Sequence, residues 1–346
     1  MFAKKFIILS IIFLLISLVR VYSYNFNLRH SLINTKKIYT IHRFHKIFDK
    51  FDHELNSQIT YNDPSIRIDS KTFQKQTSLW RILTSITFLF GYLNHTKLDA
   101  FMNNLYTNYI LNMKIFHHYS FEPLLASFCF ASYIGIYAIF DYFIPSLHKY
   151  RIQNNDSLIA WKDRLKDSLF NEVPWYLGVW VPFGGFMKAR KVSYVSPNLL
   201  VIFKEVFLGL ILYDLFFFIG HNLLHRVPFL YRFIHSKHHK LQTIRAGDSI
   251  RHTFLDGTWD VICAVLALNI LKAHAVSRSL FNIVAIGLIT EAHSGYNFPW
   301  QISNVIPLNI FAGSLAHDIH HQKGNVNYQK FFTYLDSIAK YINIKL

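Results

Sequence analysis

Long apolar segments alternate with short polar stretches over most of the chain. The strongest segment, 121–144, is broken only near its ends, by Glu122 and Asp141. It is long enough to cross a bilayer, whose hydrocarbon core takes about 20 helical residues. Two further segments, 198–220 and 254–271, have a comparable length and apolar content. We therefore expect an all-α fold, a polytopic membrane helical bundle of about four spans.

Three other apolar segments are weaker as candidate spans. The segment 79–93 fits either a short span or an interfacial helix, and 279–290 is shorter still. The segment 170–186 contains Pro174 and Pro182, and proline interrupts a helix, so we expect a re-entrant or broken segment there. With these segments the count is four or five spans, which carry a histidine-rich cytosolic helical cap.

The N-terminus has the pattern of a targeting segment. Lys4 and Lys5 precede an apolar run at 6–19, which Arg20 closes. This order is typical of a secretory signal peptide, and an uncleaved signal anchor is the alternative for residues 1–20.

A basic stretch follows the first apolar run. Residues 21–78 are rich in polar and basic side chains and resemble a transit peptide, or else form a basic tether. We assign 79–346 to one membrane-embedded domain.

Composition supports a membrane protein over a soluble one. Hydrophobic residues make up 52% of the 346 residues and charged residues only 16%, whereas soluble domains carry about 25% charged residues. The net charge of +16 is dispersed between apolar segments. It therefore favours basic cytoplasmic loops that face anionic lipid and disfavours a nucleic-acid partner. Cys129 and Cys263 lie inside apolar runs and are expected to be buried thiols.

Three histidine boxes are the most informative motifs. The first has the spacing HxxxH, and the second and third have the spacing HxxHH. Residues three or four positions apart lie on one face of a helix, so each box can direct its imidazoles to one centre. The eight box histidines are His221, His225, His235, His238, His239, His317, His320 and His321.

The number of imidazoles points to a centre with more than one transition-metal ion. Imidazole suits iron, zinc, copper and nickel, so ligand type alone does not name the metal. Soluble di-iron carboxylate proteins use Glu-x-x-His pairs, which this sequence lacks. We therefore expect an all-nitrogen site.

Other histidines carry weaker signals. His293 follows the 279–290 segment, and His252 follows the second box, so either is a further candidate ligand. The adjacent pair at 117–118 has no third partner nearby. Isolated histidines are more often structural or surface residues, and we assign to this class His30, His42, His45, His53, His95 and His148.

These motifs resemble the fatty acid hydroxylase / sterol desaturase superfamily of integral-membrane di-iron enzymes. The resemblance spans about 145–336, and within it the segment His293–Trp300 is similar to a signature of the C-4 methylsterol oxidases. The matching stretches, in order, are Lys149–Gln153, His221–Arg226, Tyr231–His239, His293–Trp300, His317–His321 and the following Asn327, Tyr328, Phe332 and Asp336.

The resemblance implies roles for individual residues. The eight box histidines would be metal ligands, with His293 and His252 as further ligands. Asp214, Asp318 and Asn297 would lie behind the ligands, and a carboxylate there can orient an imidazole through its free N–H. Candidate walls of a lipid pocket are Tyr213, Phe216, Phe217, Phe254, Trp259 and Trp300.

The chain departs from the family pattern at several positions. Asn222 replaces a basic residue, Lys240 replaces an acid and Val326 replaces a glycine, while 249–253 lacks the acid and proline usual around His252. None of these changes removes a box histidine. They bear on which lipid is recognised.

The chemistry that the resemblance implies is hydroxylation of an unactivated C–H bond of a membrane lipid. It uses two iron ions, with zinc as a substitute in a purified sample, together with O2. Electrons come from cytochrome b5 and an NAD(P)H-dependent reductase, at the endoplasmic reticulum or an organelle membrane. A sterol C-4 methyl group is the expected target. Fatty acyl, sphingoid or isoprenoid lipids, or an inactive metal-stabilised scaffold, are the alternatives.

Overall fold

The computed structural model describes residues 68–346 except 154–157, 175–177, 179–191, 242 and 342–346. The segments expected at 1–20 and through most of 21–78 lie outside the described residues, as does much of 170–186. The described part of the chain is helical and has no named strand, only two isolated bridges, Arg151 with Tyr296 and Phe311 with Phe332. The expectation of an all-α fold is confirmed.

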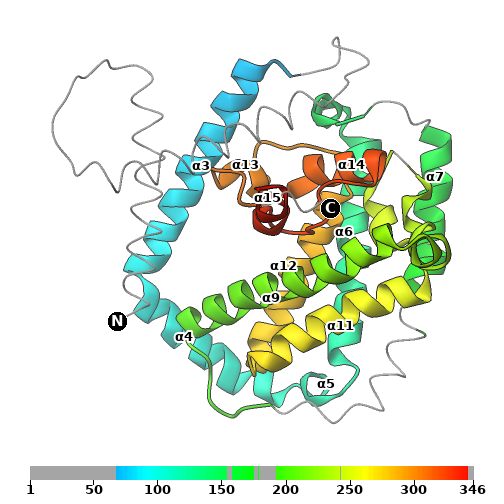
Figure 1. Ribbon diagram of the computed structural model, residues 1–346. Helices are drawn as coiled ribbons and strands as arrows, with labels where there is room; N and C mark the ends of the chain where they lie inside the picture. The colour runs from blue at the N-terminus through cyan, green and yellow to red at the C-terminus, as the bar shows by residue number, and fades with distance from the viewer. Residues whose placement is uncertain (1–67, 154–157, 175–177, 179–191, 242, 342–346) are drawn as a thin grey trace. The chain divides into compact units, whose positions relative to one another are not determined.

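The helices are distributed over the whole described chain (Figure 1). In order they are α3 (Ser70–Leu93), α4 (His95–Asn108), η2 (Ile110–Asn112), α5 (Lys114–His117), α6 (Phe121–Phe143), η3 (Pro145–Tyr150), α7 (Leu158–Asp167), η4 (Ser168–Glu172), α9 (Leu199–Arg226), α10 (Pro228–Leu230), η5 (Tyr231–His235), η6 (His238–Lys240), η7 (Ala246–Ile250), α11 (Phe254–Ile270), α12 (Ala275–Ala292), α13 (Ile302–Val305), α14 (Gly313–Lys323) and α15 (Tyr334–Tyr341).

The described residues fall into two compact units. The smaller unit contains Ile68–Leu93 and Phe298–Ile310, and so holds α3 and α13. The Arg81 guanidinium donates to the Asn304 carbonyl from Nε at 3.0 Å and from Nη2 at 2.8 Å. Trp80 lies beside Trp300 with ring centroids 5.9 Å apart. The weak candidate span at 79–93 forms the exposed, apolar second half of α3.

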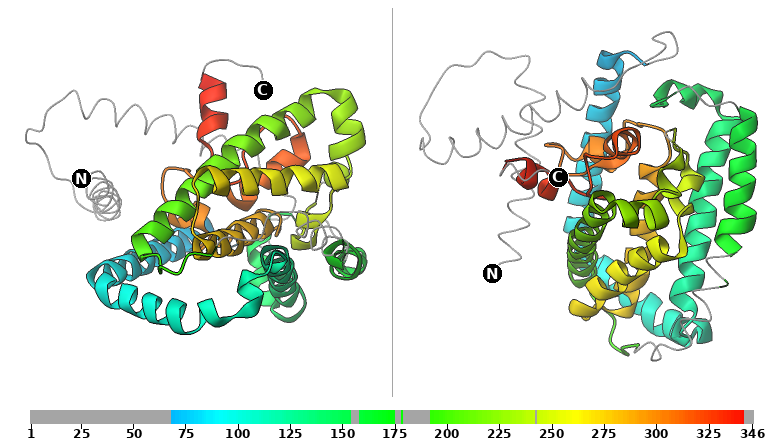
Figure 2. Two further views of the ribbon diagram at one scale, coloured as in Figure 1. Left: turned by 90° about the horizontal axis from the view of Figure 1, so that it is seen from below. Right: turned by 45° about the vertical axis from the view of Figure 1, so that its right-hand side comes forward.

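The larger unit contains the histidine boxes and is built around four long helices. Within it, α9 packs against α11 and α12, and α12 packs against α6. Both views of Figure 2 show α9 and α11 side by side. Their directions are opposite, because an added Cβ at Gly209 would meet Leu268 and one at Gly220 would meet the Trp259 ring.

Local sequence explains where these helices begin. The Asn198 side chain accepts a hydrogen bond from the Val201 amide at 2.9 Å and caps α9. The Thr253 hydroxyl accepts from the Asp256 amide at 3.4 Å and caps α11. Such side chains satisfy amide groups that have no partner inside the helix.

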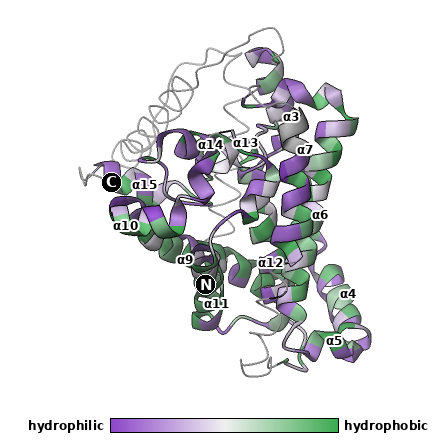
Figure 3. Ribbon diagram, turned by 90° about the vertical axis from the view of Figure 1, so that its right-hand side faces the viewer, coloured by the Kyte–Doolittle hydropathy of each residue, from purple (hydrophilic) through white to green (hydrophobic). Residues whose placement is uncertain are grey.

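Two of the described helices are long and apolar enough to cross a membrane, namely α6 and α12. The apolar run at 279–290 appeared short for a span, but the helix extends it at both ends to Ala275 and Ala292. The run at 198–220 continues as one helix through the first histidine box to Arg226. In Figure 3 hydrophobic colour dominates α9 and α11, whereas α14, which carries the third box, is largely hydrophilic.

Candidate metal centre

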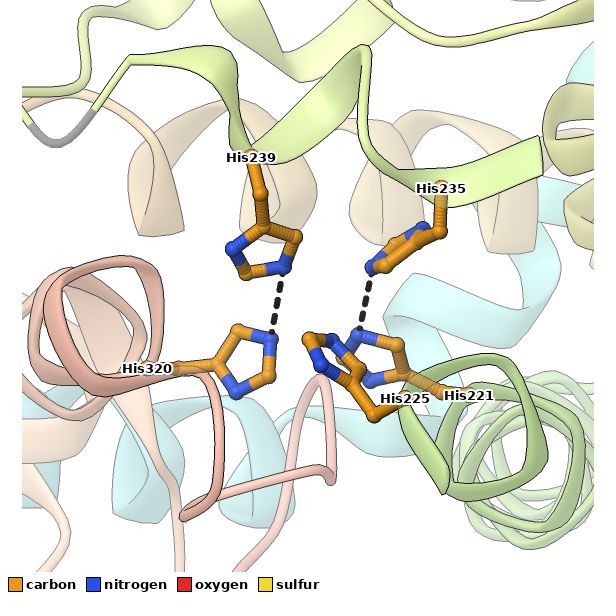
Figure 4. A group of neighbouring side chains, drawn as sticks. All are labelled: His221, His225, His235, His239 and His320. Atoms are coloured by element: carbon orange, nitrogen blue, oxygen red, sulfur yellow. Dashed lines mark hydrogen bonds between the residues drawn. The ribbon is translucent and has the colours of Figure 1, made fainter. Parts of the chain in front are cut away.

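The structure gathers nine histidines into two groups, and within each group the ring nitrogens lie within 4.8 Å of one another. Group A consists of His221, His225, His235, His239 and His320 (Figure 4). Group B consists of His238, His293, His317 and His321. All eight box histidines and His293 are therefore brought together, from the end of α9, the η5–η6 segment, the end of α12 and α14.

The box spacing divides the ligands between the groups. In the first and second boxes the pairs four residues apart, His221 with His225 and His235 with His239, belong to group A. In the third box the corresponding pair belongs to group B. The extra histidine of each HxxHH box joins the other group: His238 goes to group B and His320 to group A. The expectation that each box serves a single centre was wrong for these two boxes, because residues three and four positions apart diverge by part of a turn.

Burial favours the neutral form of several of these imidazoles. It lowers the pKa of His293 to about 3 and that of His320 to about 3. The pKa values of His317 and His321 lie well below the usual value for the same reason, and neighbouring histidines lower them further. A neutral imidazole has a free lone pair, which is the form that binds a metal ion.

In group A, hydrogen bonds fix which ring nitrogen carries the proton. His221 donates from Nδ1 to the Tyr328 carbonyl at 2.8 Å, and His235 donates from Nδ1 to the Asp256 carboxylate at 2.8 Å. In the neutral form that binds metal, both rings then carry a lone pair on Nε2, and these two atoms face each other at 3.0 Å. Two lone pairs at that distance repel unless a cation lies between them.

The rest of group A shows the same pattern. His320 donates from Nδ1 to the Val326 carbonyl at 2.7 Å and directs Nε2 toward Nε2 of His239 at 3.1 Å. Nε2 of His225 is buried and has no hydrogen-bond partner. A metal ion would satisfy each of these nitrogens at once.

Group B repeats the pattern with other supports. His293 donates from Nδ1 to the Ile289 carbonyl at 2.8 Å, and His238 donates to the Arg251 carbonyl at 3.3 Å. Their Nε2 atoms face each other at 3.3 Å. Nε2 of His317 lies 2.9 Å from that of His293 and 3.2 Å from that of His321. The residues of both groups thus fit a metal ion held by imidazole nitrogen.

The carboxylate behind an imidazole is Asp256, which the sequence reasoning missed. Asp256 lies in the first turn of α11 and is buried, with its carboxylate on His235. A carboxylate there fixes the tautomer and raises the basicity of the ligand. The available signal was an acid at the start of the helix after the second box, four residues beyond His252.

The expected role of Asp214 was wrong. Its carboxylate touches no imidazole and instead accepts four hydrogen bonds from the segment Gln329–Phe332. These donors are the Gln329 side chain and the amides of Lys330, Phe331 and Phe332, at 2.8 to 3.0 Å. Asp214 therefore fastens this segment to α9, and the segment starts beside Tyr328, the partner of His221.

Asp318 also differs from expectation, whereas the role expected of the Asn297 side chain stays a prediction. The Asp318 carboxylate accepts from the amides of Gln153 at 2.8 Å and Gln322 at 2.6 Å, so its contacts are amides and not an imidazole. Burial raises its pKa to about 6. The backbone amide of Asn297 donates to the Tyr150 carbonyl at 2.9 Å, which ties the end of the His293 segment to η3.

His252 lies outside both groups. Its ring packs against Gly257, where an added Cβ would lie 2.3 Å from the imidazole carbon. Its Nδ1 donates to the Thr253 carbonyl at 3.3 Å. The described contacts make it a packing residue at the start of α11.

The residues expected to line a pocket have mixed surroundings. Tyr213 and Phe217 are buried and stacked, and the Phe217 ring lies 4.8 Å from that of His221. Trp259 packs against Gly220 with its Nε1 buried and unpartnered. Trp300 belongs to the smaller unit, where it stacks on Phe298 at 4.4 Å.

Comparison with known proteins places this geometry in a family. The model of the fatty acid hydroxylase family matches residues 206–341, which include every member of groups A and B. Cholesterol 25-hydroxylase of Homo sapiens is 30% identical over 240 residues, 64% of this chain and 86% of that protein. A cholesterol 25-hydroxylase-like protein of Danio rerio is 30% identical over 231 residues, 63% of this chain and 89% of that protein.

More distant relatives carry names of the same kind. A cholesterol 25-hydroxylase-like protein of Caenorhabditis elegans is 25% identical over 235 residues, 64% of this chain and 75% of that protein. No solved structure matches the chain. The chain belongs to the fatty acid hydroxylase / sterol desaturase superfamily and is an oxidoreductase of the lipid hydroxylase class.

Proposed function

We propose that this protein is a membrane di-iron oxygenase that hydroxylates a C–H bond of a sterol. Groups A and B would each hold one iron ion, and the nine histidines would be the ligands. Bound iron would supply the activation of O2 that an unactivated C–H bond requires.

One observation carries the proposal. His221 and His235 have each committed their Nδ1 proton, to a carbonyl and a carboxylate, and still face each other through Nε2 at 3.0 Å. His293 and His238 do the same at 3.3 Å in group B. Buried polar atoms are almost always paired, so facing lone pairs in two adjacent groups support two cations and not a hydrogen-bonded core.

The protein's own residues have distinct tasks in this reaction. The histidines hold the ions in neutral form, and the carbonyls of Tyr328, Ile289 and Val326 keep their rings in place. Six of the nine histidines are buried and the other three are half-buried, with His320 fully buried and His293 at 1% exposure. Burial excludes water from the reacting centre, which protects reactive species from side reactions.

The relatives support a sterol as substrate, and two positions on it are candidates. Relatives named cholesterol 25-hydroxylase favour carbon 25 of the side chain. The segment His293–Trp300, similar to the C-4 methylsterol oxidase signature, favours a C-4 methyl group. Substrate, O2 and electrons from cytochrome b5 and an NAD(P)H-dependent reductase would meet at the endoplasmic reticulum membrane.

The test begins with metal content. The full chain is purified anaerobically in detergent, and iron is measured per chain. It is then reconstituted with cytochrome b5 and a reductase, and given cholesterol or a 4-methylsterol under O2. We expect close to two iron ions per chain and an O2-dependent hydroxylated product from one of the sterols. The position of the new hydroxyl, found by mass spectrometry, decides between carbon 25 and the C-4 methyl group.

A matched control makes the result specific. His252→Ala removes an imidazole next to the second box that lies outside both groups, and it should keep both the iron and the product. Fewer than one metal ion per chain in the wild type, with the chain folded, would contradict the proposal. Zinc in place of iron would not, since zinc competes well for such sites.

A further inference from the structure

Lys330 is a buried cation between α9 and α11. Its ammonium lies 2.7 and 2.9 Å from the two carboxylate oxygens of Asp260 and 3.2 Å from the Tyr213 hydroxyl. The lysine side chain is 5% exposed and that of Asp260 is 23% exposed. Removing an ammonium from water is costly unless a partner compensates it. A buried ion pair beside two largely apolar helices therefore indicates a functional role.

The two partners stand next to the groups that orient facing histidines. Lys330 follows Tyr328 by two residues, and the Tyr328 carbonyl accepts from His221. Asp260 follows Asp256 by four residues on α11, one turn along the same face, and the Asp256 carboxylate accepts from His235. The ion pair thus joins the segment that carries the outer partner of one ligand to the helix that carries the outer partner of the other.

These contacts form a closed loop that includes the two facing histidines of group A. His221 and His235 face each other through Nε2 at 3.0 Å. On the far side, Lys330 and Asp260 link the segment that carries Tyr328 to the helix that carries Asp256. Phe217 lies between the ion pair and the facing histidines. Its ring centroid is 3.8 Å from the Lys330 ammonium and 4.8 Å from the centroid of the His221 ring. A cation over an aromatic face is attracted to it, so Phe217 fills the interior of the loop.

Other contacts hold the same segment to α9. Asp214 accepts from the backbone amide of Lys330 at 2.8 Å and from that of Phe331 at 3.0 Å. These bonds fix the backbone near Tyr328 against α9. The Lys330 side chain then links the same segment to Asp260 of α11. In group B the carbonyl partners of His293 and His238 belong to Ile289 and Arg251, which take no part in these contacts. The Lys330 charge acts on group B through space, where burial and then this charge lower the pKa of His293 and of His317. Loss of a nearby cation would not weaken the binding of a metal ion there.

We propose that Lys330 and Asp260 are positioning residues that hold the two facing ligands of group A, His221 and His235, in register. The proposal rests on metal binding at group A, which is part of the proposed function. It adds a residue-level prediction: loosening the ion pair weakens one of the two metal sites and spares the other.

The experiment measures metal affinity without substrate or O2. Full-length Lys330→Met in detergent is titrated with Fe²⁺ under anaerobic conditions, and the dissociation constants of the two sites are compared with wild type. Loss of an outer partner of a metal ligand costs about 10–100-fold in affinity. Lys330 acts one step behind such partners, so we expect the dissociation constant of one site to rise by about tenfold, the lower end of that range. The other should stay within about threefold. Asp260→Asn should raise the same dissociation constant. Lys330→Arg keeps the positive charge, so its metal affinity should stay close to that of the wild type.

Arg278→Met is the matched control. It removes a bidentate ion pair of similar burial, Arg278 with Glu122, which joins α12 to α6. If loss of any buried ion pair loosened the whole fold, Arg278→Met and Lys330→Met would each weaken both metal sites. Equal weakening of both sites, or no change at either, overturns the positioning role. Wild-type protein that binds no metal overturns the proposed function itself. Retention of the spared site shows that the variant has folded.

Discussion

Groups A and B present similar sets of imidazole nitrogens, but they differ in what stands behind the rings. In group A the supports are the carbonyls of Val326 and Tyr328, which belong to one segment, and the Asp256 carboxylate of α11. In group B the supports of His293 and His238 are carbonyls, and the one behind His293 belongs to its own helix, at Ile289. The carbonyl behind His238 is more distant, at 3.3 Å.

The difference predicts that the two sites bind metal unequally. A carboxylate partner makes an imidazole more basic and holds its orientation, so the metal site that it supports binds more tightly. Group A also has five histidines against four. We expect an ion at group A to be held more firmly, and the ion at group B to exchange more readily.

The largest effect should follow removal of a ligand from either group. His235→Ala in group A and His321→Ala in group B should each reduce hydroxylation by at least about 100-fold, because even an outer-partner change costs 10–100-fold in affinity. Product formation and metal per chain are measured together. Each variant should retain close to one ion. Full activity in either variant would show that only one group takes part in the reaction.

A smaller effect should follow Asp256→Asn. The asparagine oxygen can still accept the hydrogen bond from His235, so only the negative charge is lost. We expect the affinity of group A for metal to fall by about tenfold, as measured by competition with a chromogenic chelator. Since the contrast between the groups rests on this carboxylate, an unchanged affinity would remove its basis.

Chelator kinetics should separate the two sites in the wild type. An excess of chelator should remove the ions in two phases, with rate constants that differ by about tenfold, if the carboxylate contributes as such partners usually do. In Asp256→Asn the phases should merge. A single phase in the wild type, from two bound ions, would mean that the sites are equivalent.

The smallest effect should follow Asp318→Asn, although Asp318 directly follows the ligand His317. Its carboxylate contacts Gln153 and Gln322 and no imidazole, so metal affinity should change by less than about threefold. Burial raises its pKa to about 6, and the amide removes a carboxylate that is costly to bury. A tenfold loss of metal would return Asp318 to the role expected from sequence.

The sequence predicted the presence of the long helices better than the residues at which they begin and end. Apolar runs located α6, α9, α11 and α12, because burial and lipid exposure both select apolar residues. The run at 279–290 seemed short because Arg278 and Glu291 flank it, yet both residues belong to α12. Arg278 is compensated by Glu122 of α6, a pairing between distant residues that no local pattern reveals.

The site shows the same division between local and distant information. Spacing within the boxes identified the histidines, since a helix brings residues four apart together. It did not separate His238 and His320 from their box neighbours. For His238 the separation depends on the π-helical and 3-10 turns at η5 and η6. For His320 it depends on which sides of α14 face the two groups. The imidazole partner is Asp256, for which no role was expected, and Asp214 instead binds the backbone of Lys330–Phe332. Which acid meets an imidazole is decided by how α9 and α11 pack.

The facing nitrogens also bear on how the protein matures in the cell. A newly made chain without metal would have to bring uncharged, unshared lone pairs together in a dry interior, so the box segments would stay apart. Binding of ions would then complete the fold around them. Limited iron should therefore lower the amount of this protein as well as its activity, since chains that wait open are substrates for quality-control proteases.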